Sequence, residues 1–157
     1  IDFGLLLQTV DISKYELLAI PVKETWGVLM RRDAPLAEKE AISPEDLREE
    51  PLIISRQETS GALLSAWIQR DLSALNIAAT YSLLYNGSLM VEEGMGYALC
   101  LDKIINTSGD SPLCFRPLVP ALELGVYLVW KKYQVFSKAA ETFLRAVEDR
   151  LERSPEE

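Results

Sequence analysis

The sequence contains no histidine, and this absence excludes several kinds of catalytic site. Histidine is the usual general base of hydrolases and the most frequent metal ligand in proteins. Sites built from Ser, His and Asp or from Cys and His, and zinc sites that contain histidine, are therefore excluded within these 157 residues. The acidic pairs Glu49–Glu50 and Glu92–Glu93 do not replace it, because adjacent side chains on a helix point apart and both pairs are expected to be solvated. The sequence predicts no catalytic residue, no metal ligand and no cofactor.

Long apolar runs are also missing. No stretch approaches the roughly 20 apolar residues that a membrane-spanning helix needs. The first residues, Ile1 to Gly4, lack an initiator methionine and the layout of a signal peptide. The remaining composition, 48% hydrophobic and 25% charged, is typical of a globular protein with a substantial core.

Positive charge is scarce, since 16 basic residues face 24 acidic ones and the net charge is −8. Binding to a phosphate backbone needs Lys and Arg clustered on one face. The basic pairs Arg31–Arg32 and Lys131–Lys132 are too short for this and are predicted to be solvated strand ends. We therefore expect that the isolated chain does not bind duplex DNA specifically.

Cysteine occurs only twice, at Cys100 and Cys114. Both residues lie inside apolar runs that indicate strands, where a thiol usually behaves as a small buried hydrophobic group. We predict this role for both cysteines, over a disulfide or a metal site.

Apolar patterns predict a series of strands separated by helices. The strands are expected at 17–22, 25–31, 51–55, 77–84, 96–101, 113–117 and 125–130. Helix starts are indicated by Ser43 followed by Pro44 and Asp46, by Ser60 before a stripe from 61 to 72, by Asn86 or Ser88, and by Ser137. Gly94 is expected to end the third helix in a left-handed conformation. The alternation indicates an α/β fold with largely parallel sheets.

Two strand-to-helix corners are candidate ligand sites. One is the segment from Arg56 to Gly61, and the other is Asn86-Gly87-Ser88. In open α/β sheets, ligands bind beyond the carboxyl ends of the strands, where free N–H groups at a helix start favour an anion. An ordinary N-cap explains Ser60 and Asn86 as well as a ligand does. Glycines 87, 94 and 96 fit no nucleotide-binding loop.

Four segments, in this order, resemble the effector-binding domain of LysR-type transcriptional regulators: "IDFGLLL", "IPVKETWGVLMRRDAPLA", "ISPEDLREEPLIIS" and "LMVEEGMGYALCLD". The most specific parts are "VEEGMGYAL" and "MRRDAPLA". The resemblance implies a fold like that of type 2 periplasmic binding proteins, in which two α/β lobes are joined by two crossover strands and a small molecule binds between them.

The resemblance also implies a division of the chain. The crossover strands would be 25–31 and 125–130. Lobe I, incomplete, would comprise 1–31 and 125–157, and lobe II would comprise 32–124. The family's helix-turn-helix DNA-binding domain is expected to be absent, so that the chain would be an N-terminally truncated fragment.

The effector would contact the loop after the first strand of lobe II and the second corner. Some family members carry a polar or basic residue where this sequence has Leu7, near the cleft. The resemblance therefore implies these effector-binding residues: Arg56, Gln57, Glu58, Thr59, Ser60, Tyr85, Asn86, Gly87 and Leu7.

By this resemblance the chain is a ligand-sensing regulatory domain for a small polar effector, in a cytoplasmic protein that contacts no membrane. DNA would be bound only through the absent N-terminal domain. A homodimer or tetramer is expected in the parent protein, through the helix 61–72 and its Trp67, although Trp67 is equally explained as core. The alternatives are an extracytoplasmic solute-binding protein of a transporter, which a helix-turn-helix in the parent would exclude, and an enzyme, which the lack of an acid–base pair disfavours.

Overall fold

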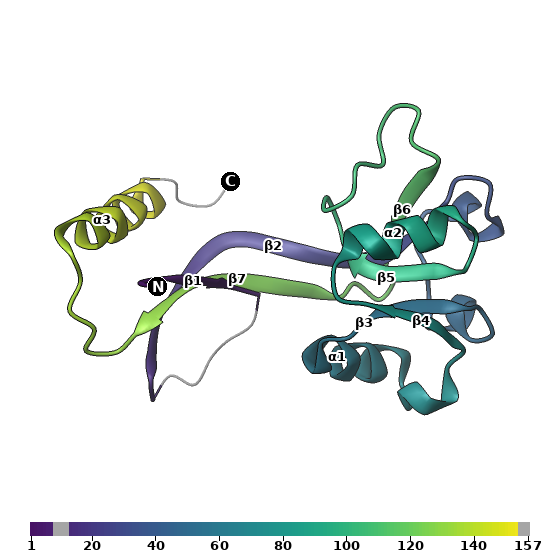
Figure 1. Cartoon of the computed structure of the whole chain (residues 1–157), viewed down its shortest axis with the longest axis horizontal. Coiled ribbons are helices and arrows are strands. Elements are labelled where there is room, and N and C mark those ends of the chain that lie inside the picture. The colour runs from purple at the N-terminus through teal and green to yellow at the C-terminus, as the bar shows by residue number, and fades with distance from the viewer. Residues whose placement is uncertain (8–12, 154–157) are drawn as a thin grey trace. The chain divides into compact units, whose positions relative to one another are not determined.

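A computed structural model describes residues 1–7 and 13–153 of the chain, without the side chains of 58–61. The chain divides into two units, Ile1–Glu24 with Leu124–Glu157 and Thr25–Glu123. The strands β2 (Tyr15–Arg31) and β7 (Glu123–Lys131) each contribute residues to both units (Figure 1). The lobe limits inferred above stay a prediction. None of the helices in the described part of the chain is sufficiently long and apolar to cross a membrane.

The first unit contains a small antiparallel ladder and a helix. β1 (Gly4–Leu6) pairs antiparallel with β7, with Gly4 opposite Val129. The ring of Phe3 stacks on that of Phe136, with 5.0 Å between centroids. It also lies 5.2 Å from Phe143 of α3 (Lys138–Glu152). The predicted start of this helix is confirmed, because the hydroxyl of Ser137 accepts a hydrogen bond from the N–H of Ala140 at 3.2 Å.

The second unit is built on a mixed sheet with the strand order β6-β2-β5-β3-β4 (Figure 1). Its further strands are β3 (Leu52–Ser55), β4 (Ile77–Tyr81), β5 (Tyr97–Leu101) and β6 (Leu113–Pro117). β3 is parallel to β4 and β5, whereas β2 is antiparallel to β5 and β6. The expectation of largely parallel sheets is therefore wrong, because β1 is also antiparallel to β7 and every parallel pair of strands within the described residues involves β3. Parallel neighbours usually need a crossover helix, and in the described part of the second unit α-helices connect only β3 to β4 and β4 to β5.

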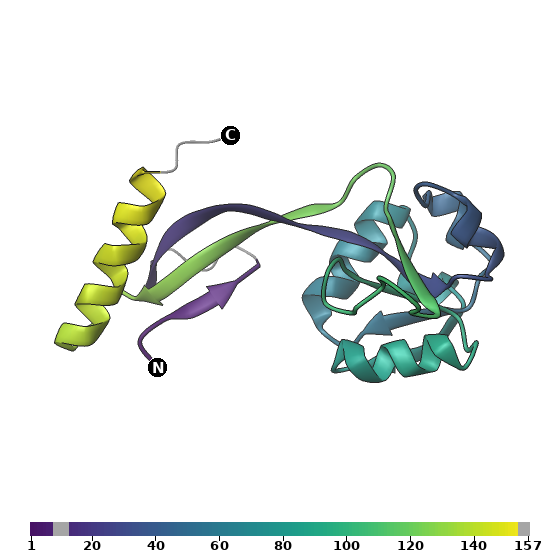
Figure 2. The same cartoon turned by 90° about the horizontal axis from the view of Figure 1, so that it is seen from above.

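Two helices cover opposite faces of this sheet, α1 (Glu58–Ile68) on one and α2 (Leu84–Glu92) on the other (Figures 1 and 2). On the α2 side, Tyr81 is buried and donates from its hydroxyl to the carbonyl of Leu99 at 2.7 Å. Burial raises the pKa of this hydroxyl, so it stays a donor at any ordinary pH. The apolar core here contains Leu29, Ile53, Tyr81, Leu84, Val91, Ala98, Cys100 and Leu113.

Short 3-10 helices complete the second unit: η1 (Pro35–Glu38), η2 (Pro44–Leu47) and η3 (Leu72–Ala74). η2 confirms the helix start predicted at Ser43 and Pro44, although it continues for only one turn. The carboxylate of Asp46 accepts hydrogen bonds from the backbone N–H and the hydroxyl of Ser43, at 3.0 and 2.8 Å. Local side-chain chemistry thus fixes this turn.

Several predicted boundaries are wrong. The two strands expected at 17–22 and 25–31 are the single strand β2, because Lys23 lies on an exposed position that an extended strand tolerates. The strand expected at 77–84 ends at Tyr81. The helix expected at 61–72 ends at Ile68, where Gln69 turns left-handed with φ 55°.

The predicted caps Ser60, Asn86 and Ser88 are also wrong. The N-cap positions are Gln57 for α1 and Leu83 for α2, and neither side chain caps its helix. Inside α2, Gly87 lies directly against the ring of Tyr81. A Cβ at position 87 would be 3.0 Å from that ring. Gly94, in contrast, ends α2 with φ +79°, as predicted.

Arg31 is the last residue of β2, and Arg31 and Arg32 are both exposed, as predicted, but each also has a structural partner. Arg32 donates to the carbonyl groups of Thr107 and Ser111, at 2.5 and 2.7 Å, and so holds the loop before β6. The guanidinium of Arg31 donates from Nε and Nη2 to the two carboxylate oxygens of Asp33, at 2.8 and 2.6 Å. The hydrogen bonds from this cation lower the pKa of the Asp33 carboxyl. Both arginines therefore form hydrogen bonds that stabilise the segments around the end of β2.

Both cysteines are buried, as predicted, with 2% of Cys100 and 4% of Cys114 exposed. Burial raises the pKa of the Cys100 thiol to about 12, so this thiol is not a nucleophile at neutral pH. β2 lies between the strands that carry them, with Gly27 opposite Cys100 and Met30 opposite Cys114. Two strand spacings separate the cysteines by roughly 10 Å, beyond the about 7 Å that a disulfide spans.

We therefore expect that oxidation of the folded chain forms no Cys100–Cys114 disulfide, and that both thiols react with a maleimide only after unfolding. Mass spectrometry of the peroxide-treated chain, with and without urea, measures this directly. Cys114→Ser is the control for cross-links between chains. An intramolecular disulfide formed without urea would contradict the strand order.

Candidate functional site

The carboxyl ends of β3 and β4 meet at one edge of the second sheet. The two strands are parallel, with Ser55 opposite Tyr81. Arg56, the residue after β3, donates its backbone N–H to the carbonyl of Tyr81 at 2.9 Å. α1 begins two residues further on, and α2 begins after Ser82 and Leu83. This edge has the position at which open α/β sheets bind ligands.

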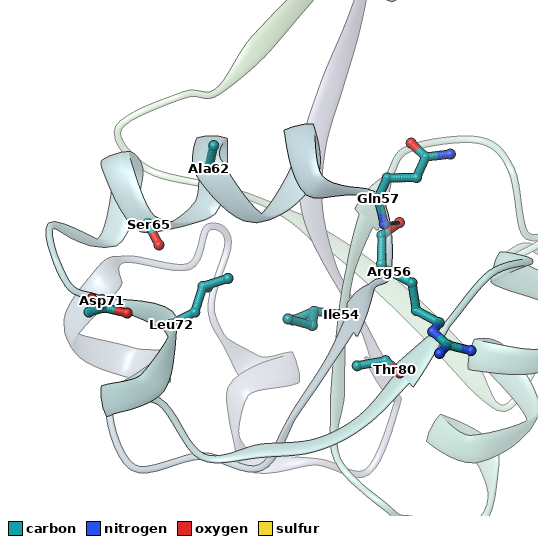
Figure 3. Close-up of a pocket in the computed structure, with 9 residues that line it drawn as sticks. Ile54, Arg56, Gln57, Ala62, Ser65, Asp71, Leu72 and Thr80 are labelled. Atoms are coloured by element: carbon teal, nitrogen blue, oxygen red, sulfur yellow. Dashed lines mark hydrogen bonds between the residues drawn. The ribbon is translucent and has the colours of Figure 1, made fainter.

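A hollow of about 650 Å³ lies between α1, η3 and the strands β3 and β4 (Figure 3). Its size is within the range of small-molecule pockets. Polar groups stand at both ends and apolar side chains lie between them (Figure 3). The lining residues are Ile54, Ser55, Arg56, Gln57, Ala62, Ser65, Asp71, Leu72 and Thr80.

The first end of the hollow is formed by Arg56, Gln57 and Thr80, all exposed. Within the described residues, the guanidinium of Arg56 has no hydrogen-bond or ion-pair partner. Arg116, in contrast, donates to the carbonyl groups of Ala37 and Lys39, at 2.7 and 2.6 Å. Arg56 thus lines the rim of the hollow, with its guanidinium directed past Thr80 (Figure 3).

The start of α1 adds further donors to this end. Gln57 has extended backbone angles and its N–H donates to the hydroxyl of Ser55 at 3.3 Å. The N–H groups of the first helical turn have no partner within the helix and carry the positive end of the helix dipole. Glu58, Thr59 and Ser60 belong to this turn, but their side chains lie outside the described part of the structure. The arrangement favours a ligand with an anionic or carbonyl oxygen.

The second end of the hollow is formed by Asp71 and Ser65 (Figure 3). One carboxylate oxygen of Asp71, Oδ1, caps η3 by accepting from the N–H and hydroxyl of Ser73, at 3.1 and 3.0 Å. These hydrogen bonds lower the pKa of Asp71, so the carboxylate is ionised at neutral pH. Sequence reasoning did not identify this end. The spacing of Asp71 and Ser73 is a capping signal, but it gives no sign that Asp71 faces a hollow.

The second predicted corner is displaced from the first. Tyr85 and Asn86 are exposed in the first turn of α2, and Gly87 is buried against Tyr81. None of the three lines the hollow. The residues that join β4 to α2 are instead Ser82 and Leu83. The structure therefore brings together Arg56 and Gln57 at the hollow and leaves the predicted contacts of Tyr85, Asn86 and Gly87 as predictions.

Leu7 follows β1 in the first unit and is half-buried. The hollow is formed by the second unit alone. The predicted role of Leu7 in effector binding stays a prediction, separate from the hollow.

Comparison with known proteins identifies the fold. CcmR regulatory domain of Synechocystis PCC6803, solved in complex with 2-PG, superposes with a TM-score of 0.78 at 16% identity, over 99% of this chain and 76% of that one. HinK, a LysR family transcriptional regulator from Pseudomonas aeruginosa, gives a TM-score of 0.77 at 19% identity, over 96% of this chain and 53% of HinK. The C-terminal domain of a probable LysR family regulator from Rhodococcus sp. RHA1 gives 0.75 at 18% identity, over 94% and 74%.

These similarities confirm the predicted α/β fold, which is that of LysR effector-binding domains and resembles type 2 periplasmic binding proteins. The chain spans about half the length of HinK. No curated protein shows significant sequence similarity to it. The model of the LysR substrate-binding domain family matches residues 1–152. The chain therefore belongs to the LysR substrate-binding domain family.

Proposed function

We propose that this domain senses a small polar effector at the hollow beside α1, with an acidic or carbonyl group of the effector held by Arg56 and the first turn of the helix. LysR effector-binding domains are regulatory domains and not enzymes. The CcmR domain was solved with the small molecule 2-PG. A small-molecule ligand is therefore the kind of partner that fits this family.

The observation that carries the proposal is the guanidinium of Arg56 at the edge where β3 and β4 end, which has no partner among the residues that the structure describes. A guanidinium forms bidentate hydrogen bonds with a carboxylate or a phosphate. The N–H groups opening α1 lie next to it in the chain and favour the same kind of group. Ile54 and Leu72 add apolar surface to the same hollow. Few convergent polar groups above an apolar floor are typical of small-molecule sites.

Effector binding would act on the whole protein by shifting its conformational equilibrium. A ligand that binds one arrangement of a protein better than another increases the population of that arrangement. In the parent protein this shift would reach a DNA-binding domain through a dimer or tetramer. The binding step itself can be tested on this chain.

We expect Arg56→Ala to weaken binding of an acidic effector about 10- to 100-fold, because hydrogen bonds to charged groups contribute about 1.5–3 kcal/mol. The chain is titrated with a panel of small carboxylates and with 2-PG, and binding is measured from thermal melting and from amide chemical shifts. Melting without ligand should be unchanged, since Arg56 is exposed.

Arg145→Ala is the matched control, because it removes the same charge from an exposed position on α3 in the other unit. It should leave binding unchanged. Thr59→Ala and Asn86→Ala test the predicted contacts around Arg56 in the same titration. If no compound binds, or if Arg56→Ala and Arg145→Ala bind equally well, Arg56 does not hold the effector.

A further inference from the structure

The turn between β7 and α3 presents two apolar side chains to solvent (Figure 1). Tyr133 is 98% exposed and Val135 is 93% exposed, and among the described large hydrophobic residues only the terminal Ile1 is more exposed. Tyr133 also has φ 59°, a left-handed conformation that a bulky residue adopts only at a conformational cost. The turn therefore holds an aromatic ring in solvent although this arrangement is unfavourable for the single chain.

Hydrogen bonds fix the backbone of this turn. The N–H of Gln134 donates to the carbonyl of Lys131 at 3.3 Å. The side-chain amide of Gln134 donates to the carboxylate of Asp2 at 2.8 Å. Tyr133 thus belongs to an anchored segment, and a large exposed ring on such a segment gains free energy when a partner covers it.

Lysines flank these two apolar side chains in the chain. Lys131 ends β7 and Lys138 begins α3, both are exposed, and neither has an ion-pair partner among the described residues. Lys132 is half-buried and lies 3.9 Å from the carboxylate of Glu16. We call residues 131–135 with Lys138 the basic turn. In a chain with a net charge of −8, its charge favours a partner surface that is acidic and partly apolar.

The second unit carries an acidic segment of this kind, residues 38–50, which follows η1 and contains η2. It has six acidic and two basic residues, so that its net charge is −4. Both basic side chains are already paired with carboxylates of the same segment. Glu38, Glu40 and Glu49 are exposed and have no ion-pair partner within the described residues. These three carboxylates are therefore available to a partner.

Tyr97 connects this segment to an exposed apolar side chain. Burial and the Glu50 carboxylate raise the pKa of the Tyr97 hydroxyl, and a hydrogen bond with the backbone of Leu36 in η1 opposes them. The N–H of Tyr97 donates to the carbonyl of Pro51 at 2.8 Å. Met95, two residues before Tyr97, is 47% exposed. We call residues 38–50 with Met95 the acidic surface.

We propose that the basic turn of one copy of this chain binds the acidic surface of a second copy. The lysines of the turn face the unpaired glutamates, and the ring of Tyr133 covers Met95, a side chain that packs well against aromatic rings. Because the contact joins two different surfaces, it leads either to a closed pair with two such contacts or to longer chains. The inference is independent of the proposed effector site, because it uses none of the residues that line the hollow.

Sedimentation velocity of the chain over a wide range of concentrations tests the association itself. At low ionic strength we expect species larger than the monomer, whose share rises with concentration. They should dissociate at high ionic strength, because salt screens contacts between exposed charges. A chain that stays monomeric at every concentration, or an association that salt does not weaken, would overturn the inference.

The double variant Lys131→Glu with Lys138→Glu reverses the charge of the basic turn and should weaken self-association about 10-fold or more. The matched control is Arg70→Glu with Lys103→Glu, at exposed positions of the second unit outside both surfaces. Each double variant replaces two positive charges by two negative ones, which changes the net charge by −4, from −8 to −12. Equal weakening by both would mean that general repulsion is the cause, and the inference would be wrong.

The partner surface is tested by Glu38→Lys with Glu49→Lys, which should also weaken self-association. Mixed with the reversed basic turn, this variant offers opposite charges again, so that the two variants should bind each other although neither associates alone. If the mixture stays monomeric, the two surfaces do not meet.

Tyr133→Asn tests the apolar part of the contact. Asn removes the ring and tolerates the left-handed conformation, so that thermal melting should not be lowered. Self-association should be weaker than in the original chain. If Tyr133→Asn associates as strongly as the original, the ring is not part of the contact and the inference is wrong.

Discussion

Gly96→Ala is expected to lower the free energy of unfolding by about 2–5 kcal/mol. Gly96 precedes β5 with φ +152°, a conformation that residues with a side chain rarely adopt. A Cβ at this position would lie 2.2 Å from the carbonyl oxygen of Pro51. The contact cannot be relieved easily, because this oxygen accepts the N–H of Tyr97 at 2.8 Å where β3 and β5 begin. Urea denaturation followed by circular dichroism measures the change.

Gly109→Ala separates backbone strain from the clash. Gly109 has φ +60°, and a Cβ there would meet no atom within 4 Å. Its substitution should therefore cost only about 1 kcal/mol, the usual strain of a left-handed residue. If the two variants were equally destabilised, the close contact with the carbonyl oxygen of Pro51 would not be the cause of the destabilisation in Gly96→Ala.

Trp67→Ala is expected to lower the free energy of unfolding by about 3–5 kcal/mol, as for other large buried aromatic residues. Only 9% of Trp67 is exposed, and its indole N–H donates to the carbonyl of Pro120 at 2.7 Å. The side chain thus joins α1 to the segment between β6 and β7, within the second unit. Chemical denaturation of the purified variant gives the value.

Trp67→Phe is a milder change, because it keeps an aromatic ring while it removes the N–H donor and part of the buried volume. It should cost about 1–2 kcal/mol. The burial of Trp67 removes the reason for expecting it at a dimer surface, although a dimer formed through other parts of α1 stays a prediction. A Trp67→Ala chain that keeps the original stability but sediments as a smaller species would contradict the core role.

Local sequence signals predicted some elements closely. β6 was expected at 113–117 and occupies these residues, and α3 begins after Ser137 as expected. In both places nearby residues are sufficient to predict the element. An apolar run between turn residues specifies a strand, and a capping hydroxyl specifies a helix start. The same is true of η2, where Ser43 and Asp46 are three residues apart.

Other elements could not be located from local signals. Asn86 and Ser88 are good capping residues, but α2 begins at Leu84, so both lie inside the helix, where Gly87 packs on the ring of Tyr81. Arg32 has no partner near it in sequence, and its bonds to Thr107 and Ser111 span 75 and 79 residues. These choices depend on contacts that exist only once the sheet has formed.

The candidate site divides in the same way. Arg56 and Gln57 could be identified from the sequence, because a strand followed by a helix places them at a strand end whatever the rest of the fold. The absence of histidine likewise determined, without any structure, which chemistries the chain cannot perform. Asp71, Ser65 and Thr80 were assigned to the hollow only by the tertiary structure. Strand order and helix packing determine which segments line the same hollow. These depend on long-range contacts, which local sequence patterns do not show.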